Sequence, residues 1–217
     1  MAITPVVAAL NDALTDLFPS GVAVAALAIT DTHPPLHETE AMAIPGAVAS
    51  RRAEFATGRA AARLALARLG HGPATIPAGP DRLPLWPTGL SGSIAHSSGY
   101  AVAAVRHGAP IGLDIEAEAG LESDLWPLIC NKDELDRLPM ASRGWFVTQI
   151  FSAKEAAYKA MYPLTRKVIG FDAMTVRLTG DDFVARLERT VGSFAGGHEF
   201  HGRLRRVHGL ILTGVAP

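Results

Sequence analysis

The sequence predicts an α+β fold made of two similar halves, residues 1–110 and 111–217, related by a pseudo-twofold axis. Each half holds one long helical segment, at residues 48–69 and 144–161, together with short apolar runs typical of antiparallel strands. A His-Gly-Ala-Pro sequence at residues 107–110 marks the join between the halves. We therefore expect each half to pack its long helix on a small, mostly antiparallel sheet, with any active site at the seam between them.

The first half begins with a helix, because apolar residues recur at helical spacing over residues 6–18. Residues 48–69 are rich in alanine and leucine, and Gly70 is placed to end that helix. The later arginines of this helix, Arg63 and Arg68, are expected to form a solvated face. The other predicted elements are a buried strand at 22–30, a proline-containing loop at 31–45, a proline-rich loop at 72–89 and a hairpin of strands 91–96 and 100–106.

The second half begins with a strand at residues 111–117 that carries two acidic side chains. A helical region follows at residues 131–161, and Pro139 breaks it. Further strands are predicted at residues 171–178, 183–187, 199–207 and 210–215. Helices and strands thus occur in both halves, as the predicted fold class requires.

The composition argues against several classes of protein. Hydrophobic residues make up 48% of the 217 positions and charged residues 19%, which allows a sizeable core. The formal net charge of −1 argues against a general nucleic-acid-binding protein. No apolar run is long enough to span a bilayer, and the N-terminus lacks the basic region of a signal peptide. The single cysteine, Cys130, excludes an internal disulfide, so we expect a cytoplasmic protein that does not bind membranes.

Two short segments carry the candidate chemistry. On the predicted strand, Asp114 and Glu116 are two positions apart, so both side chains point to the same face. On the predicted helix, Glu155 and Lys159 are four positions apart and are therefore neighbours. Three carboxylates that converge make a site for a hard cation such as Mg²⁺, which commonly shares its ligands with the phosphates of a substrate.

Each segment also has a purely structural interpretation. Asp114 and Glu116 fit the solvated face of an alternating strand. Ser152 and Glu155 fit a helix capping box, and Glu155 and Lys159 fit a stabilising ion pair on one helix. Either segment taken alone favours these structural interpretations, and their occurrence together favours the chemical one.

The two segments together resemble the signature pair of the Sfp-type 4′-phosphopantetheinyl transferases. The pair reads Gly-x-Asp-x-Glu at residues 112–116 and Phe-Ser-x-Lys-Glu-Ala-x-x-Lys at residues 151–159. Other segments are similar to the subgroup typified by the enterobactin-synthetase phosphopantetheinyl transferase. They are Arg-Arg-Ala-Glu-Phe-x-x-Gly-Arg at residues 51–59, Leu-Trp-Pro-x-Gly-x-x-Gly-Ser-Ile-x-His at residues 85–96, and the segments 163–171 and 209–213. The resemblance extends from about residue 48 to the C-terminus.

The resemblance implies a role for each matching residue. Asp114, Glu116 and Glu155 match the acids that bind Mg²⁺, or Mn²⁺ in its place. Lys159 matches the lysine that contacts the phosphates and assists departure of the nucleotide. Glu155 matches the base for an incoming serine hydroxyl, or the residue that orients that base. Asp114, Glu155 and Lys159 are therefore the implied catalytic residues, whereas Lys154 fits a structural salt bridge as well as it fits a role in the site.

The resemblance also implies coenzyme A as the co-substrate. The positions that match its phosphate-binding residues, including those for the 3′-phosphate, are Arg51, Arg59 and His96. Arg82, in the proline-rich loop, is either a further phosphate contact or a solvated arginine. Ile169 and Val168 fall where the family lines the pantetheine arm.

The implied reaction moves the 4′-phosphopantetheine moiety of coenzyme A to a serine of an apo acyl, peptidyl or aryl carrier protein and releases adenosine 3′,5′-bisphosphate. Such carriers serve siderophore, polyketide or nonribosomal peptide biosynthesis, and a monomer is expected to hold the whole site. Residues 126–145, with Leu128 and Met140, form either a carrier-docking segment or helix core. Two other functions fit the same residues: a Mg²⁺-dependent phosphate-ester or nucleotide hydrolase, and an inactive module that binds coenzyme A or carrier proteins.

Overall fold

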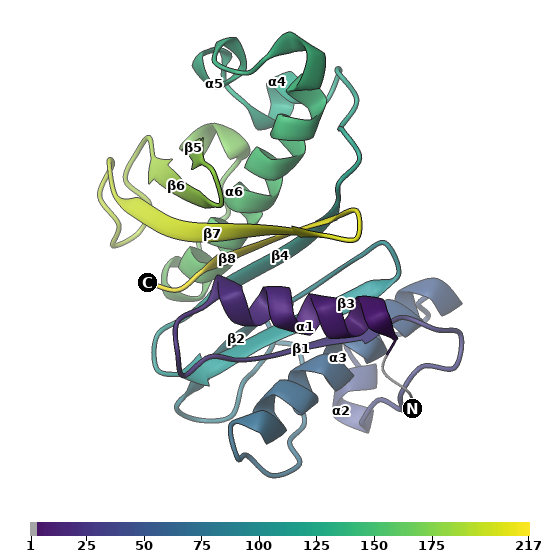
Figure 1. Cartoon of the computed structure of the whole chain (residues 1–217). Coiled ribbons are helices and arrows are strands. Elements are labelled where there is room, and N and C mark those ends of the chain that lie inside the picture. The colour runs from purple at the N-terminus through teal and green to yellow at the C-terminus, as the bar shows by residue number, and fades with distance from the viewer. Residues whose placement is uncertain (1–3) are drawn as a thin grey trace.

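The computed structural model describes residues 4–217 and contains two antiparallel sheets, each packed against a long helix (Figure 1). The first part of the chain forms α1 (Pro5–Leu17), β1 (Ala23–Ala28), α2 (Glu38–Ala41), α3 (Ala49–Arg68), β2 (Leu90–Ser97) and β3 (Tyr100–His107). Its three strands pair in the order β1-β3-β2. This order places β2 at one edge of the first sheet.

Helix α3 packs closely on this sheet because its inner face is built from small side chains. Ala61, Ala62 and Ala65 are completely buried. A β-carbon added at Gly58 would lie 3.0 Å from Cγ2 of Ile94 on β2, so the helix and the strand approach at a glycine. This close packing fixes α3 beside β2.

The second part of the chain contributes a five-stranded sheet and helix α6. Its elements are β4 (Gly112–Ala117), α4 (Trp126–Ile129), α5 (Lys132–Asp136), the 3₁₀ turn η1 (Met140–Ser142), α6 (Arg143–Thr165), the 3₁₀ turn η2 (Phe171–Ala173), β5 (Met174–Thr179), β6 (Asp182–Leu187), β7 (Glu199–Val207) and β8 (Leu210–Val215). The strands pair in the order β4-β8-β7-β6-β5. A β-carbon at Gly112 would fall 1.7 Å from the carbonyl oxygen of Ala156, so this position must be glycine for β4 to lie against α6.

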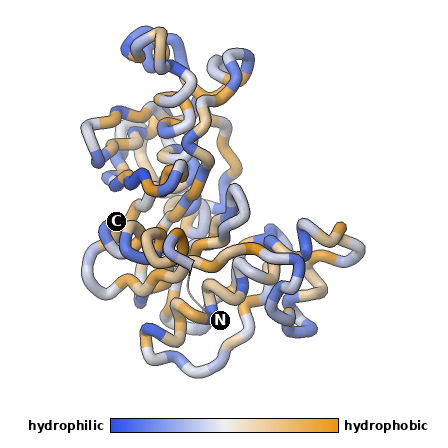
Figure 2. Tube along the Cα trace, turned by 45° about the vertical axis from the view of Figure 1, so that its right-hand side comes forward, coloured by the Kyte–Doolittle hydropathy of each residue, from blue (hydrophilic) through white to orange (hydrophobic). Residues whose placement is uncertain are grey.

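The two sheets meet where β2 lies beside β4, and we call this boundary the seam. The Ser93 hydroxyl on β2 accepts a hydrogen bond from the Leu113 N–H on β4 at 3.1 Å. Helix α1 packs on β1 of the first sheet and on β7 and β8 of the second (Figure 1). Its buried Leu10 and Leu14 belong to a core that also contains Leu113 and Leu212. Hydrophobic stretches run through the middle of the molecule, and hydrophilic residues are frequent in the outer loops (Figure 2). One hydrophobic core, formed by residues of α1 and of both sheets, therefore lies beside the seam and holds the two sheets together.

The structure confirms the predicted α+β class, with small differences in the elements. Both long helices, the hairpin and all strands of the second half lie where the sequence predicts them, although residues 171–173 form a 3₁₀ turn before β5 begins. The predicted loop at residues 31–45 contains the short helix α2. Among residues 4–217, no helix combines the length and the apolarity needed to cross a membrane.

Candidate active site

Asp114 lies in the middle of β4, and its side chain faces α6 instead of solvent. Only 4% of the residue is exposed, and neighbouring Leu113 and Ile115 are buried as well. The interpretation of this strand as one with a solvated acidic face is therefore wrong for Asp114. Helix α6 and strands β2 and β8 all pack against β4, so the carboxylate must find its partners inside the protein.

Two side chains of α6 supply those partners. The Lys159 ammonium donates to Oδ1 of Asp114 at 2.6 Å and to the carbonyl oxygen of Leu113 at 3.2 Å. The Ser152 hydroxyl donates to Oδ2 of Asp114 at 2.9 Å. Ser152 lies in the interior of α6, so it is not the N-cap that the capping-box interpretation requires. Within residues 4–217 the ion pair of Lys159 is formed with Asp114, and the predicted pair with Glu155 is absent.

The other two predicted acids are near this pair. Burial, together with the negative charges of Asp114 and Glu155, raises the pKa of Glu116 to about 7, and Lys159 opposes this shift. Burial likewise raises the pKa of Glu155, with Lys159 lowering it and Asp114 raising it. The three carboxylates and Lys159 therefore lie within electrostatic range of one another at the seam.

The donor set suits a hard divalent cation. Carboxylate oxygens are the ligands that Mg²⁺ prefers, and three carboxylates around one lysine leave negative charge that a cation would neutralise. In the described part of the chain, however, no three His, Cys, Asp or Glu side chains converge tightly enough to form a finished metal site. Asp114 already uses both oxygens in hydrogen bonds to α6.

The basic residues of the first half gather across the seam. The Arg51 guanidinium lies 2.8 Å from Nε2 of His96 and 3.1 Å from a carboxylate oxygen of Glu54. Burial lowers the pKa of His96, and the charges of Lys159 and Asp114 also act on it, with opposite signs. Arg51 and His96 are thus brought together, and His96 lies within electrostatic range of the Asp114–Lys159 pair.

Arg59 is buried on α3 and has unsatisfied hydrogen-bonding capacity. Only 5% of the residue is exposed, and its guanidinium lies 4.2 Å from the centre of the Phe55 ring. Its Nε has no hydrogen-bond partner among residues 4–217. Burial lowers the pKa of this guanidinium to about 10. A buried cationic group in this state has room to bind an anion.

The sequence predicts that two other arginines of α3 are solvated; Arg68 is exposed, whereas Arg63 is half-buried and paired with a carboxylate. One guanidinium nitrogen of Arg63 donates to both carboxylate oxygens of the fully buried Glu40 on α2, with both distances 2.8 Å. Arg68 donates to the side chain of Asn11 on α1 at 2.8 Å. Both arginines therefore fasten neighbouring elements to α3. The prediction failed for Arg63 because its partner Glu40 lies 23 positions away in sequence.

Arg82 lies in the proline-rich loop with an exposed side chain. No hydrogen bond or ion pair joins that side chain to any other part of residues 4–217. The neighbouring Asp81 pairs with Arg166, which follows the end of α6. The structure thus leaves the Arg82 side chain exposed and without a polar partner among the described residues.

Two cavities open on either side of Tyr158. The smaller, of about 220 Å³, is lined by Lys154, Glu155, Tyr158, Val168, Ile169, Gly170, Phe171 and Met174. The larger, of about 490 Å³, lies between the proline-rich loop, β2 and α6, and Trp86, Tyr158, Lys159 and Tyr162 are among its lining residues. Glu155 and Lys159 therefore face different cavities from one helix.

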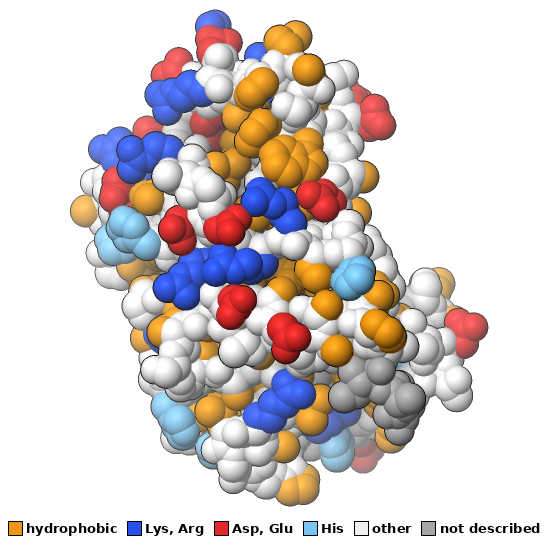
Figure 3. All heavy atoms as spheres, in the orientation of Figure 1, with side chains coloured by type: hydrophobic (Ala, Val, Ile, Leu, Met, Phe, Trp, Pro, Cys, Tyr) orange, Lys and Arg blue, Asp and Glu red, His pale blue; other side chains and the backbone are white. Residues whose placement is uncertain are grey.

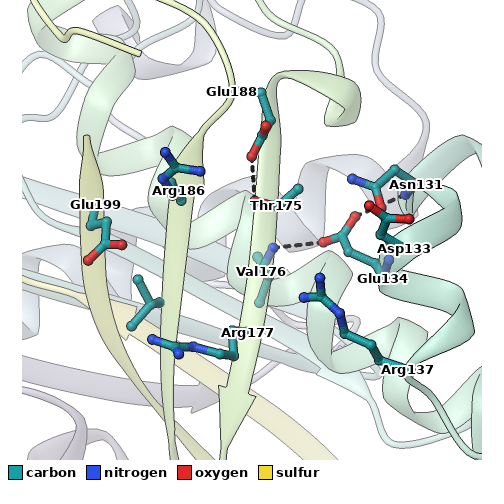
Figure 4. Close-up of a pocket in the computed structure, with 11 residues that line it drawn as sticks. Asn131, Asp133, Glu134, Arg137, Thr175, Val176, Arg177, Arg186, Glu188 and Glu199 are labelled. Atoms are coloured by element: carbon teal, nitrogen blue, oxygen red, sulfur yellow. Dashed lines mark hydrogen bonds between the residues drawn. The ribbon is translucent and has the colours of Figure 1, made fainter. Parts of the chain in front are cut away.

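Lys154 is sealed inside the protein. Its ammonium donates to Glu134 at 2.9 Å and to the carbonyl oxygens of Ile129 at 2.7 Å and Phe171 at 3.2 Å. Glu134 also accepts the backbone N–H of Val176 at the edge of β5 at 2.7 Å (Figure 4). Of the two interpretations of Lys154, the structural salt bridge is correct. The sequence gives no sign of this partner, which lies 20 positions away on α5.

A further cleft of about 410 Å³ lies between α5 and strands β5 and β6 (Figure 4). Arg137, Arg177 and Arg186 are among its lining residues. Within the described residues, its lining contains none of the predicted catalytic or phosphate-binding side chains, so it is separate from the seam.

Comparisons with known proteins identify the family to which the chain belongs. The sequence profile of the 4′-phosphopantetheinyl transferase N-terminal domain matches residues 38–106, and that of the 4′-phosphopantetheinyl transferase superfamily matches residues 110–202. The chain is 33% identical to the 4′-phosphopantetheinyl transferase Npt of Nocardia iowensis over 216 residues, which cover 92% of this chain and 97% of that protein. It is 36% identical to PptT of Mycobacterium tuberculosis over 195 residues, or 83% of this chain and 85% of PptT.

A shorter match, with 39% identity over 115 residues, joins 51% of the chain to 48% of enterobactin synthase component D of Salmonella typhi. This match agrees with the resemblance found in the sequence. The extended matches to Npt and PptT decide the assignment: the chain belongs to the 4′-phosphopantetheinyl transferases, enzymes that transfer phosphopantetheine from coenzyme A to carrier proteins.

Proposed function

We propose that phosphopantetheine transfer takes place at the seam, around Asp114, Glu155 and Lys159. The observation that carries the proposal is the 2.6 Å ion pair between Lys159 on α6 and Asp114 on β4. This pair lies at the edge of the 490 Å³ cavity, and Glu155, one turn earlier on α6, lines the 220 Å³ cavity. One face of α6 thus presents a cation and an acid to two adjoining spaces.

In the proposed step, the serine oxygen of the carrier attacks the β-phosphorus of coenzyme A. The bond from that phosphorus to the oxygen of the nucleotide phosphate breaks, and adenosine 3′,5′-bisphosphate leaves. Glu155 takes or directs the serine proton, and Lys159 balances the charge that gathers on the departing phosphate. Reactions of this type depend mainly on positioning and electrostatic stabilisation, so the protein needs no nucleophile of its own.

Asp114, Glu116 and Glu155 are the residues proposed to hold Mg²⁺, or Mn²⁺. A bound Mg²⁺ would neutralise charge on the pyrophosphate. Burial is the main cause of the raised pKa values of Glu116 and Glu155, and the negative charge of Asp114 adds to both shifts. A cation held by these carboxylates would stabilise their ionised forms, which supports this proposal. Ile115, between the first two acids, has an apolar side chain that cannot act as a ligand.

The same geometry suggests where coenzyme A binds. Arg51, Arg59 and His96 are proposed to hold its 3′-phosphate, and the unpartnered Nε of buried Arg59 supports an anion there. The 490 Å³ cavity is proposed for the nucleotide. Arg82, which precedes the lining residue Leu83, is proposed as a further phosphate contact. The 220 Å³ cavity is proposed for the pantetheine arm, with Ile169 in its wall.

A carrier-docking face is proposed around α4 and η1. Leu128 is 68% exposed and Met140 is 72% exposed, so the helix-core interpretation does not hold for these two residues. Hydrophobic side chains gather on the upper part of the molecule, where α4 and α5 lie (Figure 3). Both parts of the proposed site come from one chain, so a monomer is expected to be active. Carriers of siderophore, polyketide and nonribosomal peptide synthesis are the candidate partners.

The reaction is tested with apo carrier proteins, coenzyme A and Mg²⁺, with intact mass as the measurement. Transfer adds one phosphopantetheine to the carrier, and the Asp114→Asn and Glu155→Gln variants should abolish it while the far-ultraviolet circular dichroism stays unchanged. Asp182→Asn, an exposed acid on β6, is the matched control and should leave loading unaltered. Normal loading by either active-site variant would refute the role given to that residue.

The same assay separates the competing functions. A hydrolase would consume coenzyme A and leave the carrier unmodified, and an inactive module would bind coenzyme A without turnover. For the docking face, Leu128→Asp should raise the KM for apo carrier and leave the KM for coenzyme A unchanged. Met42→Asp alters a similarly exposed apolar residue that directly follows α2 and should change neither value.

A further inference from the structure

Asp114 is held by a chain of two buried hydroxyls. The Ser152 hydroxyl on α6 lies 2.9 Å from Oδ2 of Asp114 and 2.8 Å from Oγ1 of Thr213. Thr213 lies directly opposite Asp114 on the neighbouring strand β8, and its Oγ1 is also 2.8 Å from the Ser152 carbonyl oxygen. Ser152 and Thr213 are both completely buried.

The number of hydroxyl protons sets the direction of these hydrogen bonds. Each hydroxyl has one proton to donate, and an ionised carboxylate can only accept. Asp114 pairs with Lys159 and is therefore taken as ionised, so the Ser152 proton goes to Asp114. The Thr213 proton is then donated to Ser152, whose hydroxyl and carbonyl oxygens both lie within reach. Donation therefore runs from Thr213 to Ser152 to Asp114.

The fold alone does not account for a serine at position 152. Its neighbours Ala153, Ala156 and Ala157 are completely buried, so the surrounding space suits a small side chain. Alanine would fill this space and is a better helix former than serine. A hydroxyl in such an environment is tolerated because it has partners, and its charged partner is Asp114.

The two oxygens of Asp114 receive their hydrogen bonds from two different residues. Lys159 binds Oδ1 and Ser152 binds Oδ2, so the plane of the carboxylate is fixed between two points of α6. With Ser152 removed, the carboxylate would be free to turn and offer both oxygens to Lys159. The hydrogen bonds of Ser152 and Thr213 thus help to set the orientation of the Asp114 carboxylate at the seam.

We propose that Ser152 and Thr213 are positioning residues, which set the orientation of the Asp114 carboxylate for phosphopantetheine transfer. This inference rests on the proposed function, because the two hydroxyls can affect the reaction only if Asp114 takes part in it. Neither residue is expected to touch coenzyme A or the carrier.

The test compares kcat, measured by carrier loading, with coenzyme A affinity, measured by calorimetry without carrier. Ser152→Ala should lower kcat by about ten-fold or more, since small displacements of catalytic groups have large effects on rate, and should change the affinity by less than about three-fold. Thr213→Val, which removes the hydroxyl at almost constant volume, should lower kcat by about three-fold. Thr213→Ser, which keeps a hydroxyl at this position, should retain the original kcat.

Thr148→Val is the matched control. Thr148 is also a buried hydroxyl residue of α6, but it donates only to the backbone carbonyls of Ala119 and Gly144. Its variant should lower thermal stability and leave the kcat of the folded enzyme within about two-fold of the original. An equal loss of kcat in Thr148→Val and Ser152→Ala would reduce Ser152 to a structural role and overturn the inference.

Asp114→Asn separates this inference from the proposed function. If Asp114→Asn keeps full activity, the role proposed for Asp114 fails. If Asp114→Asn is inactive and Ser152→Ala retains its kcat within two-fold, only the positioning inference fails.

Discussion

Helix α6 carries two lysines five residues apart, and each pairs with a carboxylate from another element. The Lys154 side chain is 2% exposed and its partner Glu134 is 3% exposed. The Lys159 side chain is 27% exposed, and it lines the 490 Å³ cavity while it contacts Asp114. Lys154 is thus buried in the protein interior, whereas Lys159 lies in the wall of a cavity.

The hydrogen bonds show what each pair can do. Lys154 has three acceptors for its three donors, and Glu134 receives bonds on both oxygens from Lys154, Asn131 and Val176. Lys159 has two protein acceptors among the described residues, so part of its capacity is left for a ligand. A saturated buried pair fastens elements together, whereas an unsaturated pair beside a cavity is suited to chemistry.

Among the lysine variants, the largest effect on the rate is expected from Lys159→Met. Removal of a cation that stabilises charge in the transition state costs about a hundred- to a thousandfold in kcat. Carrier loading followed by intact mass measures the rate, and thermal unfolding checks the fold. Because Ser152 still binds Asp114 in this variant, the protein should remain folded. A rate within ten-fold of the original would show that Lys159 does not act on the phosphates.

Lys154→Met should have the opposite effect to Lys159→Met, with a large loss of stability and a small loss of rate. It leaves the buried Glu134 carboxylate without its cation, which costs about 3–5 kcal/mol of unfolding free energy. In a domain of this size, that loss lowers the Tm by about 10 °C. Denaturant unfolding measures the loss. The kcat per folded molecule should fall much less than in Lys159→Met, and an equal fall would contradict the division between the two lysines.

A second change should recover part of that stability. In Lys154→Met with Glu134→Gln, the buried position no longer carries an unpaired charge, and the amide oxygen can still accept the Val176 N–H. We expect the double variant to be about 1–2 kcal/mol more stable than Lys154→Met alone. Glu134→Gln by itself is the control. A double variant less stable than both single variants would show that charge is not the cause of the loss.

The sequence predicts the long elements and the acids of the site because their signals are local. Asp114 and Glu116 share a strand face through two-residue spacing, and α3 and α6 are long enough to show their character. The roles of Lys154 and Lys159, in contrast, depend on partners that are distant in sequence. Glu134 reaches α6 from 20 positions away and Asp114 from 45, so spacing within the motif could not distinguish Lys154 from Lys159.

The same reason explains the failed interpretations. Ser152 matches a capping box in its spacing, but its hydroxyl partners lie on β4 and β8. Arg63 looks like a solvated arginine until α2, a helix of four residues, brings Glu40 against it. Helices this short leave no periodic pattern, so neither α2 nor its buried carboxylate could be predicted.

The smallest effect is expected from Lys132→Met, which removes a third lysine–carboxylate pair. Lys132 contacts Asp136 one turn further along α5, but its side chain is 85% exposed and that of Asp136 is 58% exposed. Water and salt screen such a pair, so its loss should change neither the Tm nor the rate of carrier loading measurably. Thermal unfolding at low and high salt measures the first and intact mass the second. A loss of stability as large as that in Lys154→Met would mean that burial does not distinguish the lysine pairs, and the contrast between Lys154 and Lys159 would need another cause.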